Sequence, residues 1–163
     1  MQRDGKMRNG LAKDNSYGKS GTARFLDGGG KIGLSFNLGM GNIIQLGAGY
    51  ELRTPTASTA FASPEINNDF VRDLKNEKVF SSEVAYRYMG AVLSASLSGY
   101  YSRMEDVTEW QNFYFDDINS FTYVSMTGIK KEYYGVELGL KLKLTSFLDL
   151  KAIGTISEAK NIN

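Results

Sequence analysis

The sequence predicts an all-β protein, an antiparallel up-and-down meander of about six to eight strands. Three observations lead to this fold class. Apolar residues recur at every second position in six separate segments. The connections between these segments alternate between short and long. No stretch keeps the helical period of about 3.6 residues, with capping residues at its ends, that an amphipathic helix requires.

The composition excludes several classes of function before any motif is considered. The 163 residues include no cysteine and no histidine, which excludes disulfide scaffolds, thiolate zinc sites and imidazole-dependent catalysis. The formal net charge is only +1, so the charge balance does not favour a nucleic-acid partner. We therefore predict a protein that is not an enzyme, has no catalytic residues, holds no metal or cofactor and binds no nucleic acid.

Each of the six segments alternates apolar residues with small or polar ones, as a strand with one apolar face does. The second segment has the length of a membrane-spanning strand, about 9–11 residues, and the fifth shows the clearest alternation. In chain order the segments are Lys31–Leu38, Ile43–Arg53, Phe80–Tyr88, Ala91–Ser102, Glu132–Leu144 and Leu148–Ile156. Two further strands are expected near Thr22–Leu26 and Trp110–Val124.

The connections place all tight turns at one end of the sheet. Short hairpin turns are expected at Gly39–Asn42, Met89–Gly90 and Thr145–Phe147. Two long loops, Thr54–Lys78 and Met104–Lys131, then lie together at the opposite end. Loops this long are uncommon in compact domains and often carry function.

This rhythm is typical of outer-membrane barrels, which have short periplasmic turns and long extracellular loops. Aromatic residues on the apolar face align near the long-loop ends of the strands, as an interfacial girdle does: Tyr50, Phe80, Tyr101 and Tyr134. Outer-membrane lipid is then the expected partner of the apolar face, which carries Ile44, Leu46, Leu97, Leu138, Leu140 and Leu142. A soluble lipocalin-like ligand-binding barrel, with its apolar face inside, shows the same alternation and stays open as an alternative.

The opposite face carries charge of both signs. Its charged members are Glu51, Arg53, Glu83, Arg87, Glu137 and Lys141. In a soluble barrel these residues would face solvent, whereas in a plugged membrane barrel they would line the lumen and face the plug. Glycines share this face and leave room for a neighbour, at Gly33, Gly47, Gly49, Gly135 and Gly139.

Several segments resemble, in order and spacing, one family of membrane receptors. Gly47–Pro55 resembles a strand that ends in an Arg-x-Pro segment, and Leu74–Glu83 resembles the following loop exit, with Asn76 where other branches have proline. Gly99–Asp106 resembles the next rising strand, and Gly135–Glu137 supplies the Gly-Val-Glu of the descending one. The chain thus resembles the barrel of TonB-dependent outer-membrane receptors, especially the branch with an N-terminal carboxypeptidase-regulatory-like domain.

The resemblance implies a segment of a barrel of roughly 22 strands around a plug. It implies active uptake of a nutrient such as a siderophore, haem or a glycan across the cell outer membrane, with a TonB-type energy transducer acting on the plug. We expect residues 1–163 to be a fragment of that barrel domain, without plug or signal peptide, whose partners are the plug and the remaining strands. Its sheet should stay open at the strands near Thr22–Leu38 and Leu148–Ile156. A self-contained small outer-membrane barrel with a structural or adhesion role is the alternative.

The segment Met104–Lys131 is the main candidate for ligand contact. It holds the only tryptophan, Trp110, together with Tyr114, Asp116 and Asp117. Aromatic rings stack on sugars or flat ligands, and adjacent carboxylates accept hydrogen bonds. The alternative is an ordinary hairpin above the membrane, stabilised by cross-strand aromatic pairs.

Two other patterns predict no site. Gly28–Gly33 matches G-x-G-x-x-G, but a strand follows it where a bound nucleotide would need a helix. Asp69, Asp73 and Glu77 lack the spacing of a calcium loop, so we expect them to be solvated.

Overall fold

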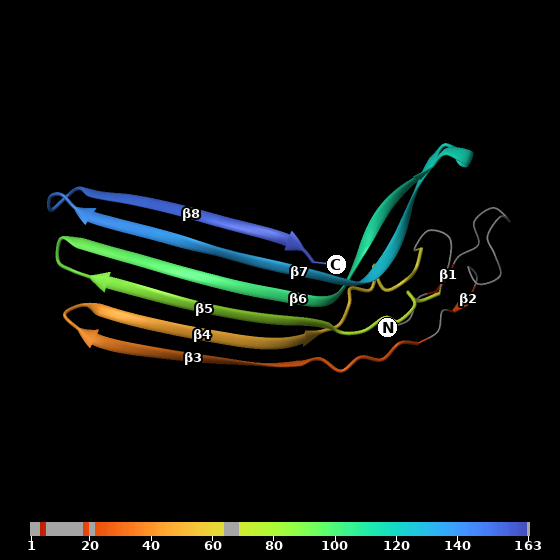
Figure 1. The fold of residues 1–163 in the computed structure, drawn as a ribbon, viewed down its shortest axis with the longest axis horizontal. Helices are drawn as coiled ribbons and strands as arrows, with labels where there is room; N and C mark the ends of the chain where they lie inside the picture. The colour runs from red at the N-terminus through yellow and green to blue at the C-terminus, as the bar shows by residue number, and fades with distance from the viewer. Residues whose placement is uncertain (1–3, 6–17, 20–21, 64–68, 163) are drawn as a thin grey trace.

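The computed structural model describes residues 4–5, 18–19, 22–63 and 69–162. Six long strands form one antiparallel sheet in which each strand pairs with its neighbours in sequence (Figure 1). They are β3 (Gly28–Gly39), β4 (Asn42–Arg53), β5 (Glu77–Met89), β6 (Leu93–Phe115), β7 (Ser120–Lys143) and β8 (Asp149–Asn161). A two-stranded pair joins β1 (Asp4–Gly5) to β2 (Gly18–Lys19). The predicted all-β meander is confirmed.

The sheet is open at both edges. Its strand order begins with β3 and ends with β8, and within the described ranges these two strands do not pair with each other. The predicted open edges are therefore confirmed, and the described strands do not close into a small barrel.

The prediction of a strand near Thr22–Leu26 was wrong, because the described residues 22–27 form no strand and β3 begins at Gly28. The strand that was expected to follow the Gly28–Gly33 motif is present, but β3 begins at Gly28 and so contains the whole motif.

The register places the predicted apolar residues on one face. Directly opposite residues of neighbouring strands share a face, and one such row runs through Ile44, Tyr86, Leu97 and Leu138. Leu46 lies in the next row, opposite Leu34 and Val84. Because side chains alternate along a strand, Leu140 and Leu142 lie on the same face as Leu138. The six aliphatic residues that were predicted to share a face do so.

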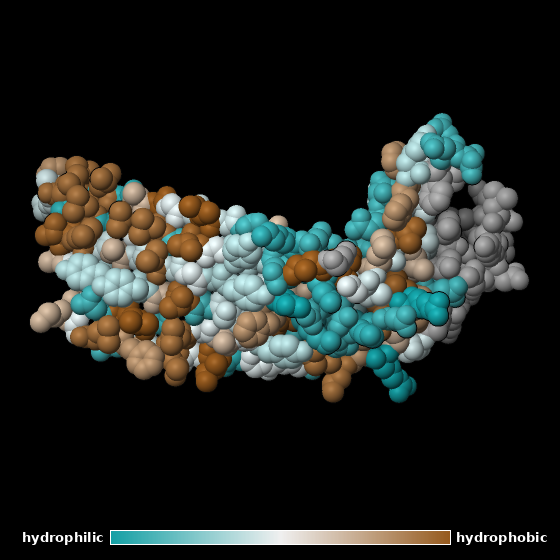
Figure 2. All heavy atoms as spheres, viewed as in Figure 1, coloured by the Kyte–Doolittle hydropathy of each residue, from teal (hydrophilic) through white to brown (hydrophobic). Residues whose placement is uncertain are grey.

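The two ends of the sheet differ in chemistry. The short turns gather at the left end of the sheet in Figure 1, where Gly39, Met40 and Gly41 adopt positive φ angles. Figure 2 shows apolar residues over this half of the molecule and hydrophilic residues where β6 and β7 leave the sheet. In the described part of the chain, no helix is both long and apolar enough to cross a bilayer.

The segment Met104–Lys131, expected to be a long loop with a further strand near Trp110–Val124, is largely a hairpin extension of β6 and β7. The residues 110–124 are extended as expected, but they form two paired strand ends joined by a turn. Pairing continues to Phe115 and Ser120, and a single turn of 3-10 helix, Asp116–Ile118, closes the tip. The register shifts twice near its base, with positive φ at Asp106 and Gly128. Each shift is a β-bulge, which bends and twists a strand pair. The hairpin accordingly bends away from the sheet (Figure 1).

The second long connection, between β4 and β5, packs on the base of this hairpin. Phe61 is buried and stacks on Phe70 at 4.8 Å between ring centroids. The Ser125 amide of β7 donates to the Ala62 carbonyl at 2.9 Å, and the Ser63 hydroxyl donates to the Tyr123 carbonyl at 3.3 Å. These contacts cover part of an otherwise unpaired strand edge.

One carboxylate of this region is not solvated as expected. Glu77 is only 6% exposed, whereas Asp69 and Asp73 are exposed. The Glu77 carboxylate accepts from Arg53 Nε at 3.0 Å and Nη2 at 2.8 Å, and from the Thr108 amide at 3.3 Å. It thereby joins β4, β5 and the base of the hairpin, a role that sequence spacing does not reveal.

Candidate functional site

The first candidate site is a hollow of about 520 Å³ on the charged face of the sheet. Its floor comes from small residues of three neighbouring strands, namely Ala85, Ser96, Ser98 and Gly139. Its rim carries Glu83, Arg87, Glu137, Lys141 and Lys151. Four of the six charged residues singled out from the sequence therefore surround one hollow, and Lys151 is an additional member.

The charged groups of this face are either paired or free. Arg53 pairs with Glu77, and Lys141 pairs with Asp149 at 2.9 Å. The carboxylates of Glu51, Glu83 and Glu137 are exposed and, among the described residues, have no cation within 4.0 Å. The same holds for the Arg87 guanidinium, which has no carboxylate within that distance in the described part of the chain. Exposed, unpaired charge of both signs is available to a polar partner.

The glycines of this face have two different roles. Gly135 makes room for a neighbouring ring, since an added Cβ would lie 2.7 Å from the Tyr100 hydroxyl. Gly139 similarly lies against the Ser96 hydroxyl. Gly47, by contrast, has open space above it. These glycines therefore leave room on the charged face, as expected. At Gly135 and Gly139, however, side chains of the neighbouring strand β6 occupy that room.

The second candidate site is an aromatic stripe on one face of the bent hairpin. Trp110 and Tyr114 lie on the same face because they are four residues apart in a strand. Register adds Phe121, opposite Tyr114, and Tyr123, diagonal to Trp110. The Tyr114 and Phe121 ring centroids are 4.9 Å apart, and those of Trp110 and Tyr123 are 6.0 Å apart. All four side chains are more than 40% exposed.

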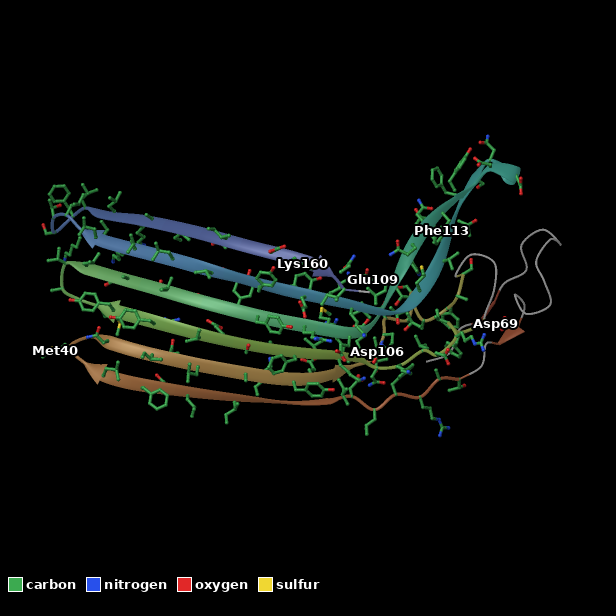
Figure 3. The ribbon with its side chains drawn as sticks, in the orientation of Figure 1. Met40, Asp69, Asp106, Glu109, Phe113 and Lys160 are labelled. Atoms are coloured by element: carbon green, nitrogen blue, oxygen red, sulfur yellow. The ribbon has the colours of Figure 1, made fainter. Side chains whose placement is uncertain are left out.

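The stripe is held in place from both ends. The Trp110 indole donates to the Ser58 carbonyl of the β4–β5 connection at 3.2 Å, and the Tyr114 hydroxyl donates to Asn119 at the tip. Asp116 and Asp117 are exposed in the tip turn beyond Tyr114. Phe113, labelled in Figure 3, precedes Tyr114 by one residue in β6 and therefore lies on the opposite face of the strand. The sequence identified Trp110 and Tyr114 but missed Phe121 and Tyr123, whose inclusion depends on the hairpin register.

No group of three or more acidic side chains in the described ranges is arranged to hold a metal ion. The two candidate sites considered so far are a charged hollow on one face of the sheet and an aromatic stripe above its loop end.

The chain is similar to known proteins in both sequence and fold. The sequence matches the family described as TonB dependent receptor-like, beta-barrel, over residues 12–160. The fold is similar to a solved structure, the copper transporter OprC, with a TM-score of 0.68 and 21% sequence identity. The match covers 82% of this chain and 20% of OprC, so the chain spans about a fifth of that protein. No curated protein matches the sequence.

Proposed function

The chain belongs to the TonB-dependent receptor-like β-barrel family, and from this membership we propose that it is a segment of an outer-membrane receptor for active nutrient uptake. The division of one sheet into an apolar face and a charged face carries the proposal. A row of rings on the apolar face includes Phe80 and Tyr101, whose centroids are 6.4 Å apart. Lipid against the apolar face and a polar plug against the charged face satisfy both surfaces.

The charged hollow is the proposed contact with the plug domain. Glu83, Arg87 and Glu137 need a polar partner if the barrel lumen is filled, since an unpaired charge loses hydration on burial. Lys141 belongs to the rim of the same hollow, and Glu51 and Arg53 extend this surface along the same face. A TonB-type transducer would act on the plug, and the remaining barrel strands would pair with β3 and β8.

The aromatic stripe is the proposed ligand contact. It lies at the end of the sheet opposite the short turns, which is the outer side in this orientation. Paired, exposed rings favour a ligand with its own flat or ring-shaped surface, such as haem, an aromatic siderophore or a glycan. Asp116 and Asp117 could accept hydrogen bonds from its hydroxyl groups. OprC is named for copper, but a similarity at 21% identity carries only the fold to this chain.

Ligand binding by the full-length receptor tests this proposal. Ferric siderophores, haem and oligosaccharides are presented to cells, and binding and uptake are measured with and without an uncoupler. Uptake of one of them should stop on uncoupling while surface binding persists. Replacing Trp110 and Tyr114 by alanine should weaken binding by roughly 5- to 150-fold, from about 1–3 kcal/mol of lost ring contacts.

Phe113→Ala is the matched control, because Phe113 belongs to the same hairpin but lies on its other face. It should leave affinity unchanged at equal surface level. Equal loss in both variants would remove the stripe from the binding site, and uptake that persists after uncoupling would contradict active transport.

A further inference from the structure

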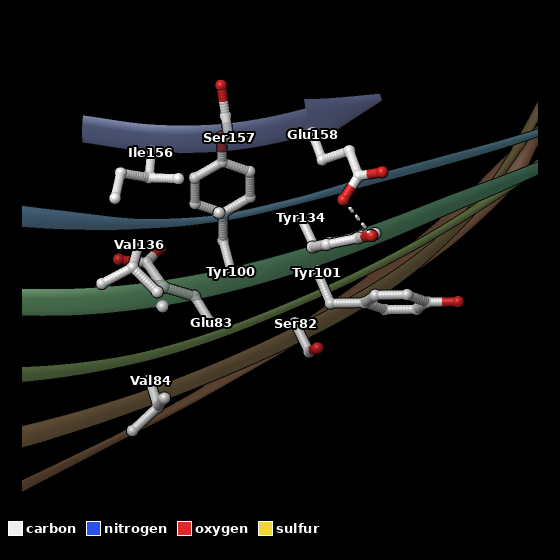
Figure 4. Close-up of a pocket in the computed structure, with 12 residues that line it drawn as sticks. Ser82, Glu83, Val84, Tyr100, Tyr101, Tyr134, Val136, Ile156, Ser157 and Glu158 are labelled. Atoms are coloured by element: carbon white, nitrogen blue, oxygen red, sulfur yellow. Dashed lines mark hydrogen bonds between the residues drawn. The ribbon is translucent and has the colours of Figure 1, made fainter. Parts of the chain in front are cut away.

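The apolar face of the sheet contains a hollow of about 660 Å³ between β5 and β8 (Figure 4). Its centre lies over Gly99, which has Val84 and Val136 as its neighbours in the same cross-strand row. An added Cβ at Gly99 would approach no atom closer than 3.9 Å, so the missing side chain leaves real space. Ile156 and the rings of Tyr101 and Tyr134 complete the walls.

Polar groups form a rim on the loop side of this hollow. The Tyr101 hydroxyl donates to Glu132 at 2.8 Å, and the Tyr134 hydroxyl donates to Glu158 (Figure 4). The Lys160 ammonium donates to the Tyr134 hydroxyl at 2.7 Å and lies 2.9 Å from Glu158.

The guanidinium of Arg103 belongs to the same rim. It donates from Nε and Nη2 to Glu105 at 2.9 and 2.8 Å, and its Nη1 lies 3.6 Å from Glu132. The side chains of Arg103 and Lys160 are 41% and 51% exposed. Because a guanidinium has five donor hydrogens and an ammonium has three, both cations keep donors that are free for another acceptor.

The rim lies at the depth where lipid headgroups begin. Ten residues separate Tyr134 from Leu144 at the turn end. At about 3.3 Å per residue and a tilt of about 40°, this distance corresponds to roughly 25 Å of membrane depth, the height of an outer-membrane apolar band. Between this level and the turns, the apolar face of the described sheet carries no Asp, Glu, Lys or Arg.

We propose that this hollow and its rim bind a phosphorylated glycolipid of the outer leaflet. One acyl chain lies in the hollow over Gly99, a phosphate contacts Arg103 and Lys160, and sugar hydroxyls donate to Glu132 and Glu158. Cations beside carboxylates and tyrosine hydroxyls complement a headgroup that carries both phosphate and hydroxyl groups. The inference rests on the proposed membrane orientation, in which the loop end is outside.

Lipid retention by the purified full-length receptor tests the site. The receptor is extracted in mild detergent and incubated with a diphosphorylated, acylated glucosamine disaccharide. The glycolipid that the receptor retains is then quantified by native mass spectrometry. Gly99→Leu fills the hollow and should lower retention at least ten-fold. Gly154→Leu is the control, because Gly154 lies on the same face with open space above it but outside the hollow.

The rim is tested separately with Arg103→Gln combined with Lys160→Gln, and Lys75→Gln serves as an exposed cation control away from the face. The double variant should lose preference for the phosphorylated glycolipid over phosphatidylethanolamine. Unchanged retention in Gly99→Leu, equal loss in Gly154→Leu, or a wild-type preference for phosphatidylethanolamine would overturn the proposal.

Membrane assembly is measured first for every variant and the wild type. A wild-type chain found outside the membrane would contradict the proposed function, whereas an assembled receptor without lipid selectivity would contradict only this site.

Discussion

At the residue scale, the charged face combines structural pairs with unpaired groups. Arg53 and Lys141 were singled out as lumen-facing, yet both are engaged within the sheet, with Glu77 and Asp149. Sequence alternation places a residue on a face, but it does not say whether a charge is already neutralised by a neighbouring strand. That requires the register, which brings Glu77 opposite Arg53. The unpaired carboxylates are therefore the better test of contact with a plug.

Reversing two of these unpaired charges should loosen the plug. In the full-length receptor, Glu83→Lys combined with Glu137→Lys places two cations around the charged hollow and turns attraction for plug cations into repulsion. Each exposed contact contributes about 0.2–1 kcal/mol, so the plug should be weakened without loss of folding. Conductance of the receptor in planar bilayers should rise. Asp116→Lys, at the exposed hairpin tip, should leave it unchanged. If the conductance of the double variant equals that of the parent receptor, these carboxylates do not contact the plug.

At the element scale, the strands in the sheet were predictable from alternation. A strand near Trp110–Val124 and a hairpin with cross-strand aromatic pairs were also expected, but the bounds and the bend of that hairpin were not. A strand between lipid and lumen has one apolar face, so period two is visible in its sequence. The hairpin extension has aromatic residues on both faces, with Trp110 and Tyr114 on one and Phe113 on the other, so alternation disappears. Two β-bulges at the base of the hairpin also interrupt the alternation of apolar and polar residues along β6 and β7. The start of β3 was missed for a related reason, because Gly28, Gly29 and Gly30 give no hydropathy signal.

The bend of the hairpin should depend on Gly128. This residue has φ +82°, and a valine in a left-handed conformation costs about 1–2 kcal/mol. Gly128→Val should therefore shift or broaden the distance distribution between spin labels at Gln111 and Lys75. Gly30→Val, in a strand with open space and no positive φ, should leave the distribution unchanged. Identical distributions in Gly128→Val and the parent would show that the bulge does not set the bend.

At the scale of the whole molecule, the six long strands form one sheet with two unlike faces and two unlike ends. Four of the five buried aliphatic or aromatic residues in the described ranges, Ala60, Phe61, Val71 and Val107, lie where the β4–β5 connection meets the hairpin. Several leucines on the apolar face of the sheet instead remain exposed, with Leu46, Leu97, Leu138 and Leu140 at 41–48%. A partner outside the chain must cover them, and lipid satisfies this requirement.

A charge on this face should prevent membrane assembly. Leu140→Arg places a cation at mid-depth of the apolar band, where it costs about 2–4 kcal/mol. The assembled fraction of the full-length receptor, measured by heat-modifiable migration and surface labelling, should fall sharply. Gly47→Ser is the suitable control, since Gly47 lies on the charged face with open space. Gly139 is less suitable, because an added Cβ would lie 2.7 Å from the Ser96 hydroxyl. Equal assembly of Leu140→Arg and Gly47→Ser would reverse the assigned orientation.

In the proposed orientation, one face of β7 contacts lipid while the other faces the lumen. Single cysteines introduced at successive positions from Val136 to Lys143, in a full-length receptor otherwise free of cysteine, can be spin-labelled and exposed to oxygen or to a water-soluble paramagnetic reagent. Labels at Leu138, Leu140 and Leu142 should be relaxed mainly by oxygen, and labels at Glu137, Gly139 and Lys141 mainly by the aqueous reagent. Accessibility with the opposite phase, or without alternation, would contradict it.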